Sequence, residues 1–155
     1  MLYWNEALYA DQAVFLKDQL IKIGIDATLN PKESGAFYAD AFAHNFDLMN
    51  HAVGYSVADP DVFISELYLK NSASNYGEYY NAQVEELFVK QSQTVDQGER
   101  RKLVRQIQDI FLKDHPNIIY FWQANWAFWW PEVKDWAPAS SIYLNQKFQD
   151  VWLAQ

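Results

Sequence analysis

The sequence has 155 residues, of which 50% are hydrophobic and 17% aromatic, and its formal net charge is -8 at pH 7. Size and composition predict one compact globular domain over residues 1–155 and exclude an intrinsically disordered chain. The negative charge argues against nucleic acid as a partner, because it repels phosphate backbones, and the absence of cysteine excludes disulfides and thiolate chemistry.

The first third of the chain predicts strands that alternate with helices. Residues 2–4 are apolar and aromatic and predict a strand. Between Ala10 and Ile23, apolar residues recur with the three- and four-residue spacing of an amphipathic helix, and Gly24 supplies a C-terminal stop. Residues 25–30 alternate apolar and polar side chains, which is the period of a half-buried strand. A shorter helix over 33–45 and another strand over 46–53 are expected to follow.

Around Asp59 the sequence predicts a loop followed by the start of a helix. Asp59 is placed as the N-cap, Pro60 as the first helical residue, and Asp61 in the first turn, where a carboxylate faces the positive end of the helix. This helix is expected to run to Lys70. The polar, turn-rich residues 71–81 predict a surface loop.

Two helices are predicted next, over residues 81–93 and within residues 95–116. In the second of them, Asp96 can act as the N-cap with Glu99 at the third helical position, and Pro116 ends the helix. Four basic residues of this helix are interpreted as a solvated face, because they stand in an acidic chain: Arg100, Arg101, Lys102 and Arg105.

The last part of the chain is rich in rings. Residues 117–123 predict a buried central strand with both faces covered, and residues 125–155 predict short extended pieces such as 142–145 and 148–153. The rings of Trp126, Trp129 and Trp130 lie close to Pro131 and are open to two interpretations, core or a ligand or partner surface. The whole pattern predicts the α/β class, mixed α+β.

No common catalytic or metal-binding motif is present. The sequence lacks the phosphate-binding glycine loops, the zinc motif H-E-x-x-H and the serine-hydrolase motif G-x-S-x-G. His44 and His51 could share a metal only if the fold brought them together. Asp59 and Asp61 could form a glycosidase-like carboxylate pair, but helix capping accounts for both. We therefore expect no enzyme activity, no cofactor and no metal.

Five segments, in this order, resemble one known family. They are FLKDQLIKIGIDATLN, FDLMNHAVGYSVADPDVF, NYGEYYNAQVEELF, ERRKLVRQIQDIFLKDHPNIIYF and FQDVWL. Their order and spacing resemble the C-terminal lobe of the family 5 extracellular solute-binding proteins, which serve ABC importers of dipeptides, oligopeptides, nickel and some sugars. The resemblance implies a periplasmic-binding-protein-like lobe with a mixed sheet flanked by helices.

The resemblance also implies a fragment of a larger two-lobed protein. A missing N-terminal lobe would complete the cleft, and a missing N-terminal signal or lipid anchor would place the protein in the periplasm or outside the cell. The implied activity is capture of a small solute, a peptide or a sugar, for delivery to an ABC permease. A lone lobe would expose apolar surface and is expected to dimerise through it.

The resemblance points to the loop after the strand at 46–53 as a ligand contact. In peptide-binding relatives this loop carries an Asp shortly before the D-P-D sequence, and that Asp pairs with the peptide's amino terminus. Here no acid precedes Asp59 in residues 54–58. The first candidate contacts are Tyr55, Ser56 and Val57, and the second are Asn125 and Trp126. An oligosaccharide-binding member of the family, a glycosidase-like enzyme and a protein-interaction module remain the alternatives.

Overall fold

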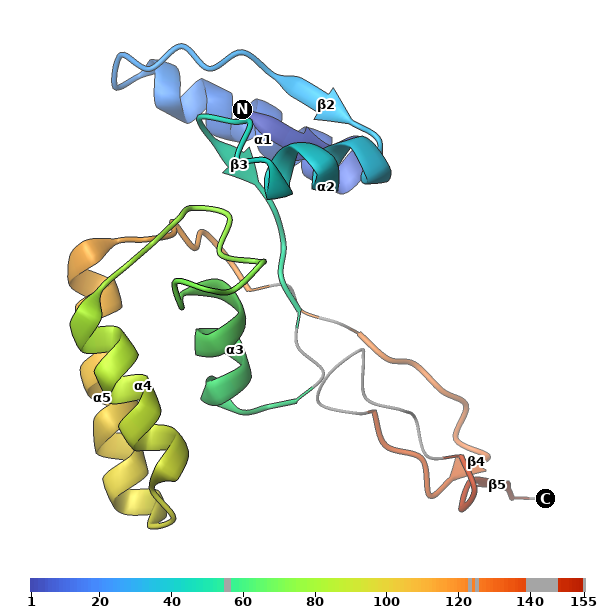
Figure 1. Cartoon of the computed structure of the whole chain (residues 1–155). Helices are drawn as coiled ribbons and strands as arrows, with labels where there is room; N and C mark the ends of the chain where they lie inside the picture. The colour runs from blue at the N-terminus through green and yellow to red at the C-terminus, as the bar shows by residue number, and fades with distance from the viewer. Residues whose placement is uncertain (55–56, 123, 125, 139–147, 155) are drawn as a thin grey trace. The chain divides into compact units, whose positions relative to one another are not determined.

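The computed structural model describes residues 1–54, 57–122, 124, 126–138 and 148–154. The chain divides into two compact units: Met1–Val53 with Glu66–Tyr79, and Gly54–Ser65 with Tyr80–Gln155. Helices and short strands occur in both (Figure 1), which confirms the predicted mixed class. Two compact units can belong to one domain, so the single domain over residues 1–155 stays a prediction.

The first unit is built on a three-stranded parallel sheet. Its order is β2-β1-β3, with β1 (Leu2–Trp4) in the centre, β2 (Asn30–Lys32) on one side and β3 (Met49–Asn50) on the other. Parallel strands cannot be joined by a tight turn, so α1 (Ala7–Ile21) connects β1 to β2, and α2 (Ser34–Phe42) connects β2 to β3 on the other side of β1. The predicted alternation of strands and helices is therefore confirmed.

The strand predicted over residues 25–30 is wrong in position. Only Asn30 of that range lies in β2, which runs on through Pro31 to Lys32. Tertiary pairing determines this shift, because Leu2 lies opposite Asn30 and Trp4 opposite Lys32. Pro31 has no N–H to donate, and an edge strand such as β2 tolerates that loss.

Helix α1 ends close to Gly24, the residue predicted to stop it. The helix ends at Ile21, two residues earlier than predicted, and the backbone N–H of Ile25 donates to the carbonyl of Leu20 at 3.0 Å. This bond closes a turn that contains Gly24, whose φ of +86° lies in the left-handed region. The core of this unit then forms from side chains with 1% exposure or less, namely Leu2, Ala13, Phe37 and Ala41.

Helix α3 (Pro60–Leu67) begins where the sequence predicted, but it ends three residues before Lys70. Asn75 explains the early end. Its buried side-chain amide donates to the carbonyls of Leu69 and Tyr79, at 3.3 and 2.8 Å, and its Oδ1 accepts from the Tyr79 N–H at 3.0 Å. These bonds hold residues 69–79 as a closed loop in place of a further helical turn.

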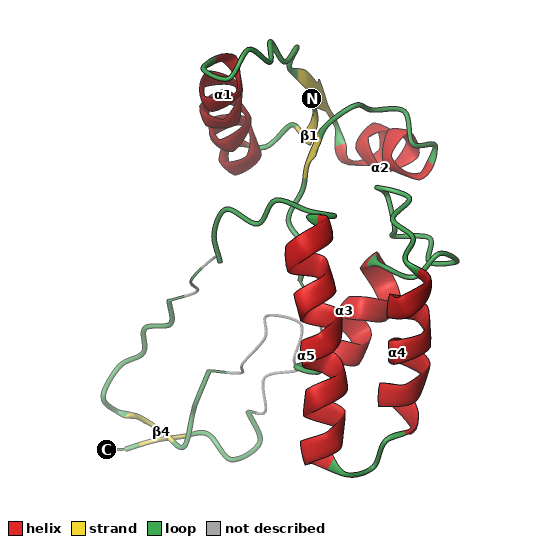
Figure 2. Cartoon of the chain, turned by 90° about the vertical axis from the view of Figure 1, so that its left-hand side faces the viewer, coloured by secondary structure: helices red, strands yellow, loops and turns green. Residues whose placement is uncertain are grey.

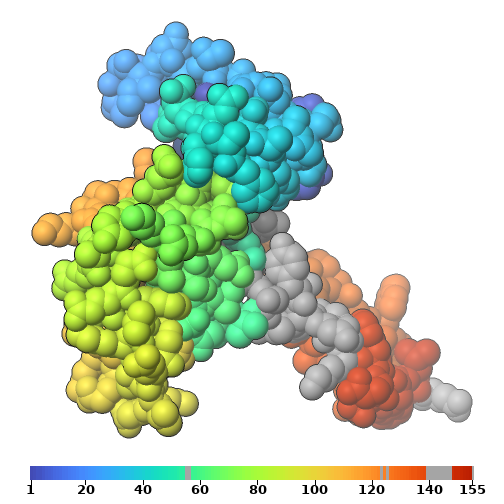
Figure 3. All heavy atoms as spheres, in the orientation of Figure 1, coloured from blue at the N-terminus to red at the C-terminus, as the bar shows by residue number. Residues whose placement is uncertain are grey.

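Helices α4 (Ala82–Gln93) and α5 (Gln97–Asp114) confirm the two predicted helices. They pack side by side (Figure 2), and their atoms are in contact in the space-filling view (Figure 3). Val84, Gln91 and Ile107 contribute side chains with 1% exposure or less. The predicted cap is also present, because Asp96 Oδ1 accepts from the Glu99 N–H at 2.8 Å.

The buried strand predicted over residues 117–123 is wrong for the described part of that range. Residues 118–122 form no strand, and their side chains are exposed. A central strand needs hydrogen-bonding neighbours on both sides, and among the described residues only β4 (Val133–Lys134) and β5 (Trp152–Leu153) form a ladder in this part of the chain. Of the predicted pieces after residue 125, residues 142–145 lie outside the described residues, and the one at 148–153 contains β5.

Candidate functional site

The loop of residues 54–59 ends in a rigid anchor. Asp59 precedes α3, and its Oδ1 accepts from the backbone N–H of Asp61 at 2.8 Å, which confirms the predicted cap. This bond satisfies one of the free N–H groups at the helix start. The last residue of the loop is therefore tied to the first turn of α3.

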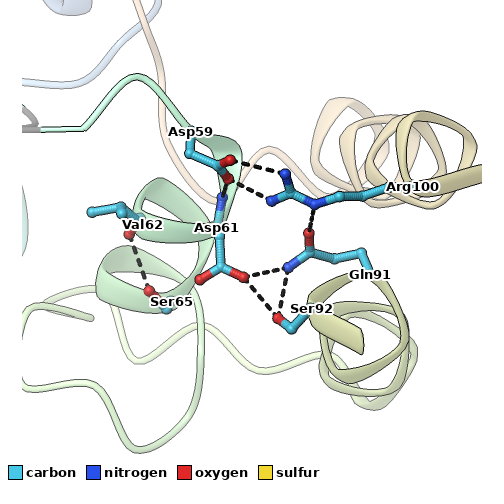
Figure 4. A network of polar contacts seen from close by, with 7 residues as sticks. All are labelled: Asp59, Asp61, Val62, Ser65, Gln91, Ser92 and Arg100. Atoms are coloured by element: carbon cyan, nitrogen blue, oxygen red, sulfur yellow. Dashed lines mark hydrogen bonds and ion pairs between the residues drawn. The ribbon is translucent and has the colours of Figure 1, made fainter. Parts of the chain in front are cut away.

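A second set of bonds ties Asp59 to α5 (Figure 4). Arg100 donates from Nη1 to Asp59 Oδ2 at 2.8 Å and from Nη2 to Asp59 Oδ1 at 2.5 Å. Its Nε donates to Gln91 Oε1 at 2.9 Å. A guanidinium that binds both oxygens of a carboxylate is fixed in orientation as well as in distance.

The network continues from Gln91 to Asp61 (Figure 4). Gln91 Nε2 donates to Asp61 Oδ2 at 2.6 Å, and Ser92 Oγ donates to the same oxygen at 2.7 Å. Gln91 is fully buried, so these bonds satisfy an amide that water does not reach. We call Asp59, Asp61, Gln91, Ser92 and Arg100 the Asp59 clamp.

The charges of the clamp stabilise each other. The hydrogen bond from Arg100, helped by that from the Asp61 N–H, lowers the pKa of Asp59 from 3.8 to about 2. The same bond raises the pKa of Arg100. Both groups are therefore ionised at neutral pH, and both oxygens of Asp59 already accept hydrogen bonds from the protein.

The interpretation of Arg100 as part of a solvated face is wrong. Arg101, Lys102 and Arg105 are exposed, as predicted, but Arg100 is half-buried and forms the centre of the clamp. No local pattern indicated this role, because Asp59 and Arg100 are 41 positions apart. Helix capping already accounted for Asp59, so the sequence held no separate signal for its link to Arg100.

The predicted ligand contacts fall into two groups. Tyr55, Ser56 and Asn125 lie outside the described residues. Val57 and Trp126 are described, and both are exposed, at 51% and 81% of their full surface. Their accessibility permits contact with a ligand, and their role as contacts stays a prediction.

Trp126 lies in residues 117–131, which we call the ring segment; the described residues of this segment are exposed. The segment contains no charged residue. Large apolar side chains of the segment that are exposed include Ile118, Ile119, Tyr120, Phe121, Trp122, Trp126, Phe128, Trp129 and Trp130. An apolar surface of this length is typical of a binding or interaction surface. The surface interpretation of Trp126, Trp129 and Trp130 is thus favoured over burial in the core.

The histidines make other contacts than those of a metal pair. His44 Nδ1 lies 3.0 Å from the carbonyl of Tyr76, and His51 lies among aromatic rings. His115 follows α5 in a left-handed conformation, and its N–H donates to the Phe111 carbonyl at 2.9 Å. Within the described residues, no three His, Asp or Glu side chains are gathered as a metal site would require.

Among the described residues, no helix is long and apolar enough to cross a membrane.

No protein-family model and no curated protein matches the sequence. Solved structures do. DppA, the ABC transporter-associated periplasmic binding protein of Helicobacter pylori in complex with the peptide STSA, is 28% identical with a TM-score of 0.69, over 74% of this chain and 23% of that one. The oligopeptide-binding protein AppA of Bacillus subtilis, in complex with a nonapeptide, is 25% identical with a TM-score of 0.63, over 74% and 23%.

A third solved structure is similar to this chain over almost its whole length. HbpA2 of Haemophilus parasuis is 19% identical with a TM-score of 0.76, over 99% of this chain and 32% of that one. The chain thus spans between 23% and 32% of the length of these three proteins. This similarity confirms the resemblance read from the sequence: the chain is similar to one part of the substrate-binding proteins of ABC transporters.

Proposed function

We propose that this chain forms one wall of a cleft in which an ABC-importer substrate-binding protein captures a peptide or a similar small solute. The similarity to peptide-bound DppA, at 28% identity, is the observation that carries the proposal. The chain spans 23% of that protein, so a second lobe would supply the opposite wall. Delivery to a membrane permease, and a periplasmic or extracellular location with a signal or lipid anchor, are parts of the same proposal.

The Asp59 clamp supports the use of the preceding loop as a contact. Asp59 is held by α3 through the Asp61 N–H and by α5 through Arg100. A binding loop whose end is fixed loses less conformational entropy when a ligand binds than a loop with a free end. Val57 is two residues from this anchor and is exposed. The loop is therefore suited to present a contact to a solute.

The clamp also restricts which solute the loop can recognise. Both oxygens of Asp59 are bound within the protein, and residues 54–58 contain no other acid. A buried ammonium group without a counter-charge is unfavourable. We therefore propose that this loop does not pair with the amino terminus of a peptide.

The first experiment titrates the protein that carries this sequence with the peptide STSA and with N-acetylated STSA, followed by tryptophan fluorescence. We expect the two dissociation constants to agree within about threefold, because acetylation removes a charge that the loop does not use. A loss of more than about tenfold on acetylation would contradict this expectation and would show that the protein recognises the amine, with a counter-charge that residues 54–58 do not contain.

The second candidate is an oligosaccharide-binding protein of the same family. The bonds from Arg100 to both oxygens of Asp59 favour it, because a sugar has no amine to neutralise, and the exposed ring of Trp126 could stack on a sugar face. Maltotetraose in the same titration decides between the two, since binding of the sugar with both peptides silent would establish this candidate. No hydrolysis of any of these ligands is expected, and measurable turnover would contradict a binding-only function.

A pair of variants tests the proposed contact at Trp126. Trp126→Ala is expected to weaken binding by about tenfold, through loss of a stacking surface. Phe128→Ala is the matched control, because Phe128 lies in the same segment and is 88% exposed, but it is not a predicted contact. If both variants lost the same binding affinity, Trp126 would not be a specific contact, and the effect would belong to the ring segment as a whole.

A further inference from the structure

His51 has an unusual environment in the first unit. It follows β3, and the centroid of its ring lies 5.4 Å from that of Phe37 and 6.0 Å from those of Tyr38 and Tyr76. Its Nδ1 is buried and has no hydrogen-bond partner among the described residues. A buried polar atom without a partner is costly, and it becomes more costly when the group carries a charge.

Tyr76 attaches a loop to this cluster. Residues 69–79 are closed on themselves by the bonds of Asn75 described above, and Tyr76 extends from this loop to α2 and His51. Its ring lies 5.6 Å from that of Phe42, and its carbonyl accepts a hydrogen bond from His44 Nδ1 at 3.0 Å. Tyr76 is therefore a docking residue that belongs to the loop and is held by rings outside it.

We propose that His51 is a pH-sensitive latch, in which protonation of its imidazole releases Tyr76, and with it the loop of residues 69–79, from α2 and β3. This inference is independent of the proposed solute-binding function. It uses only contacts within the first unit.

The charged groups around His51 do not compensate an imidazolium. Among the described residues, the titratable side chains whose rings contact that of His51 are Tyr38 and Tyr76. Asp40, the carboxylate of α2, instead accepts a hydrogen bond from Asn45 at 3.2 Å and lies 3.4 Å from the ammonium of Lys32. The charged side chains of residues 66–79 are exposed; they are Glu66, Lys70 and Glu78.

Burial accordingly lowers the pKa of His51 from its usual 6.5. The neutral imidazole is favoured in the docked state, so docking is fully stabilised above pH 6.5 and is weakened as the pH falls below that value. Between 6.5 and the lowered pKa, the ratio of docked to undocked loop falls by up to about tenfold for each pH unit. The latch is therefore closed at neutral pH and is weakened as the solution becomes acidic.

Tyr76 is the neighbour that moves at least cost. Phe37 is fully buried in the core of the unit, and both Phe37 and Tyr38 are fixed on a helix. Tyr76 lies in a turn-rich loop without regular structure, and regions of this kind open most readily. Its departure would admit water to His51 Nδ1 and leave the core in place.

The test is an NMR titration of the chain from pH 7.5 to 5.0. The chain has three histidines, so each ring can be assigned with one variant. We expect His51 to titrate below 6.5, and the NOEs between the Tyr76 and Phe42 rings to disappear in step with it. A His51 that titrates at or above 6.5, or NOEs that persist after it is protonated, would overturn the proposal.

Two variants separate the latch from a general effect of acid. His51→Phe keeps an aromatic ring but cannot be protonated, so its Tyr76–Phe42 NOEs should persist at pH 5.0. His44→Gln keeps a donor for the Tyr76 carbonyl and should lose the NOEs as the wild type does. If His51→Phe does not fold, His51→Gln replaces it with the same expectation. Loss of the NOEs in the non-titrating His51 variant would refute the latch.

Discussion

Asp59 joins three parts of the second unit through one side chain. It ends the loop of residues 54–59, caps α3 through the Asp61 N–H, and binds Arg100 of α5. The helix cap was visible in the sequence because all its parts are adjacent. The link to Arg100 was not, because a salt bridge across 41 positions leaves no local pattern.

Replacement of Asp59 by Asn should destabilise the chain at pH 7. The side chain is 34% exposed, so we expect a loss of about 1–3 kcal/mol in the free energy of unfolding, between the values for surface and buried ion pairs. The pKa of Asp59 is lowered to about 2, so its contribution is complete above pH 3.8 and is lost as the pH falls from there through about 2. Urea denaturation at pH 7, 4 and 3 measures the trend.

Glu86→Gln is the control for this experiment. Glu86 pairs with Lys90 at 2.6 Å on an exposed helix face, where an ion pair contributes little. We expect no measurable change at pH 7. The clamp would have no structural importance if Asp59→Asn and Glu86→Gln unfolded at the same urea concentration.

Helices were the elements most accurately predicted, because their end signals lie within a few residues. Asn81 is such a signal for α4. Its Oδ1 accepts from the N–H groups of Gln83 and Val84, at 3.0 and 3.4 Å, and its Nδ2 donates to Asp114 at the end of α5 at 2.9 Å. One side chain thus begins α4 and connects it to the end of its neighbour.

Asn81→Ala removes both functions and should cost about 0.5–2 kcal/mol in the free energy of unfolding. Asn81→Ser retains an oxygen for the cap but not the amide that binds Asp114, so its loss should be smaller. Chemical denaturation of the three proteins, followed by far-UV circular dichroism, measures the difference. Equal losses in the two variants would mean that the bond to Asp114, and not the cap, determines the stability of this helix start.

Strands were predicted less well, for a reason that both errors share. The alternating pattern of residues 25–30 and the apolar pattern of 117–123 describe side chains only, whereas a strand is defined by its partner. Residues 30–32 pair with β1 even though they contain a proline, and residues 118–122 are apolar but form no strand. Side-chain patterns were therefore misleading in these two segments, because they do not show which strand a segment pairs with.

The ring segment is the feature that bears on the whole molecule. Its side chains are exposed, it carries no charge, and the chain spans only 23% to 32% of the length of three structurally similar proteins. Under the function proposed above, the second lobe would cover this surface. When the segment is uncovered, the hydrophobic effect favours its burial against a second copy.

We therefore expect concentration-dependent dimerisation of the 155-residue chain, measured by sedimentation velocity. The triple variant Trp126→Asp, Phe128→Asp and Trp130→Asp should weaken it at least tenfold, because charges would be buried at the contact. Val95→Asp is the control, since Val95 is 95% exposed outside the segment. A chain that is monomeric at all concentrations, or a triple variant that associates like the wild type, would contradict this prediction.

The sequence was sufficient to predict the mixed class, the five helices of the described residues, the caps at Asp59 and Asp96, and the resemblance to ABC-transporter binding proteins. Each of these depends on residues close together or on the order of short segments. Only the tertiary structure revealed the register of β2, the Asp59 clamp and the aromatic surroundings of His51. They depend on which distant groups meet, and a distant hydrogen-bond partner, or a missing one, has no signature in the residues around it.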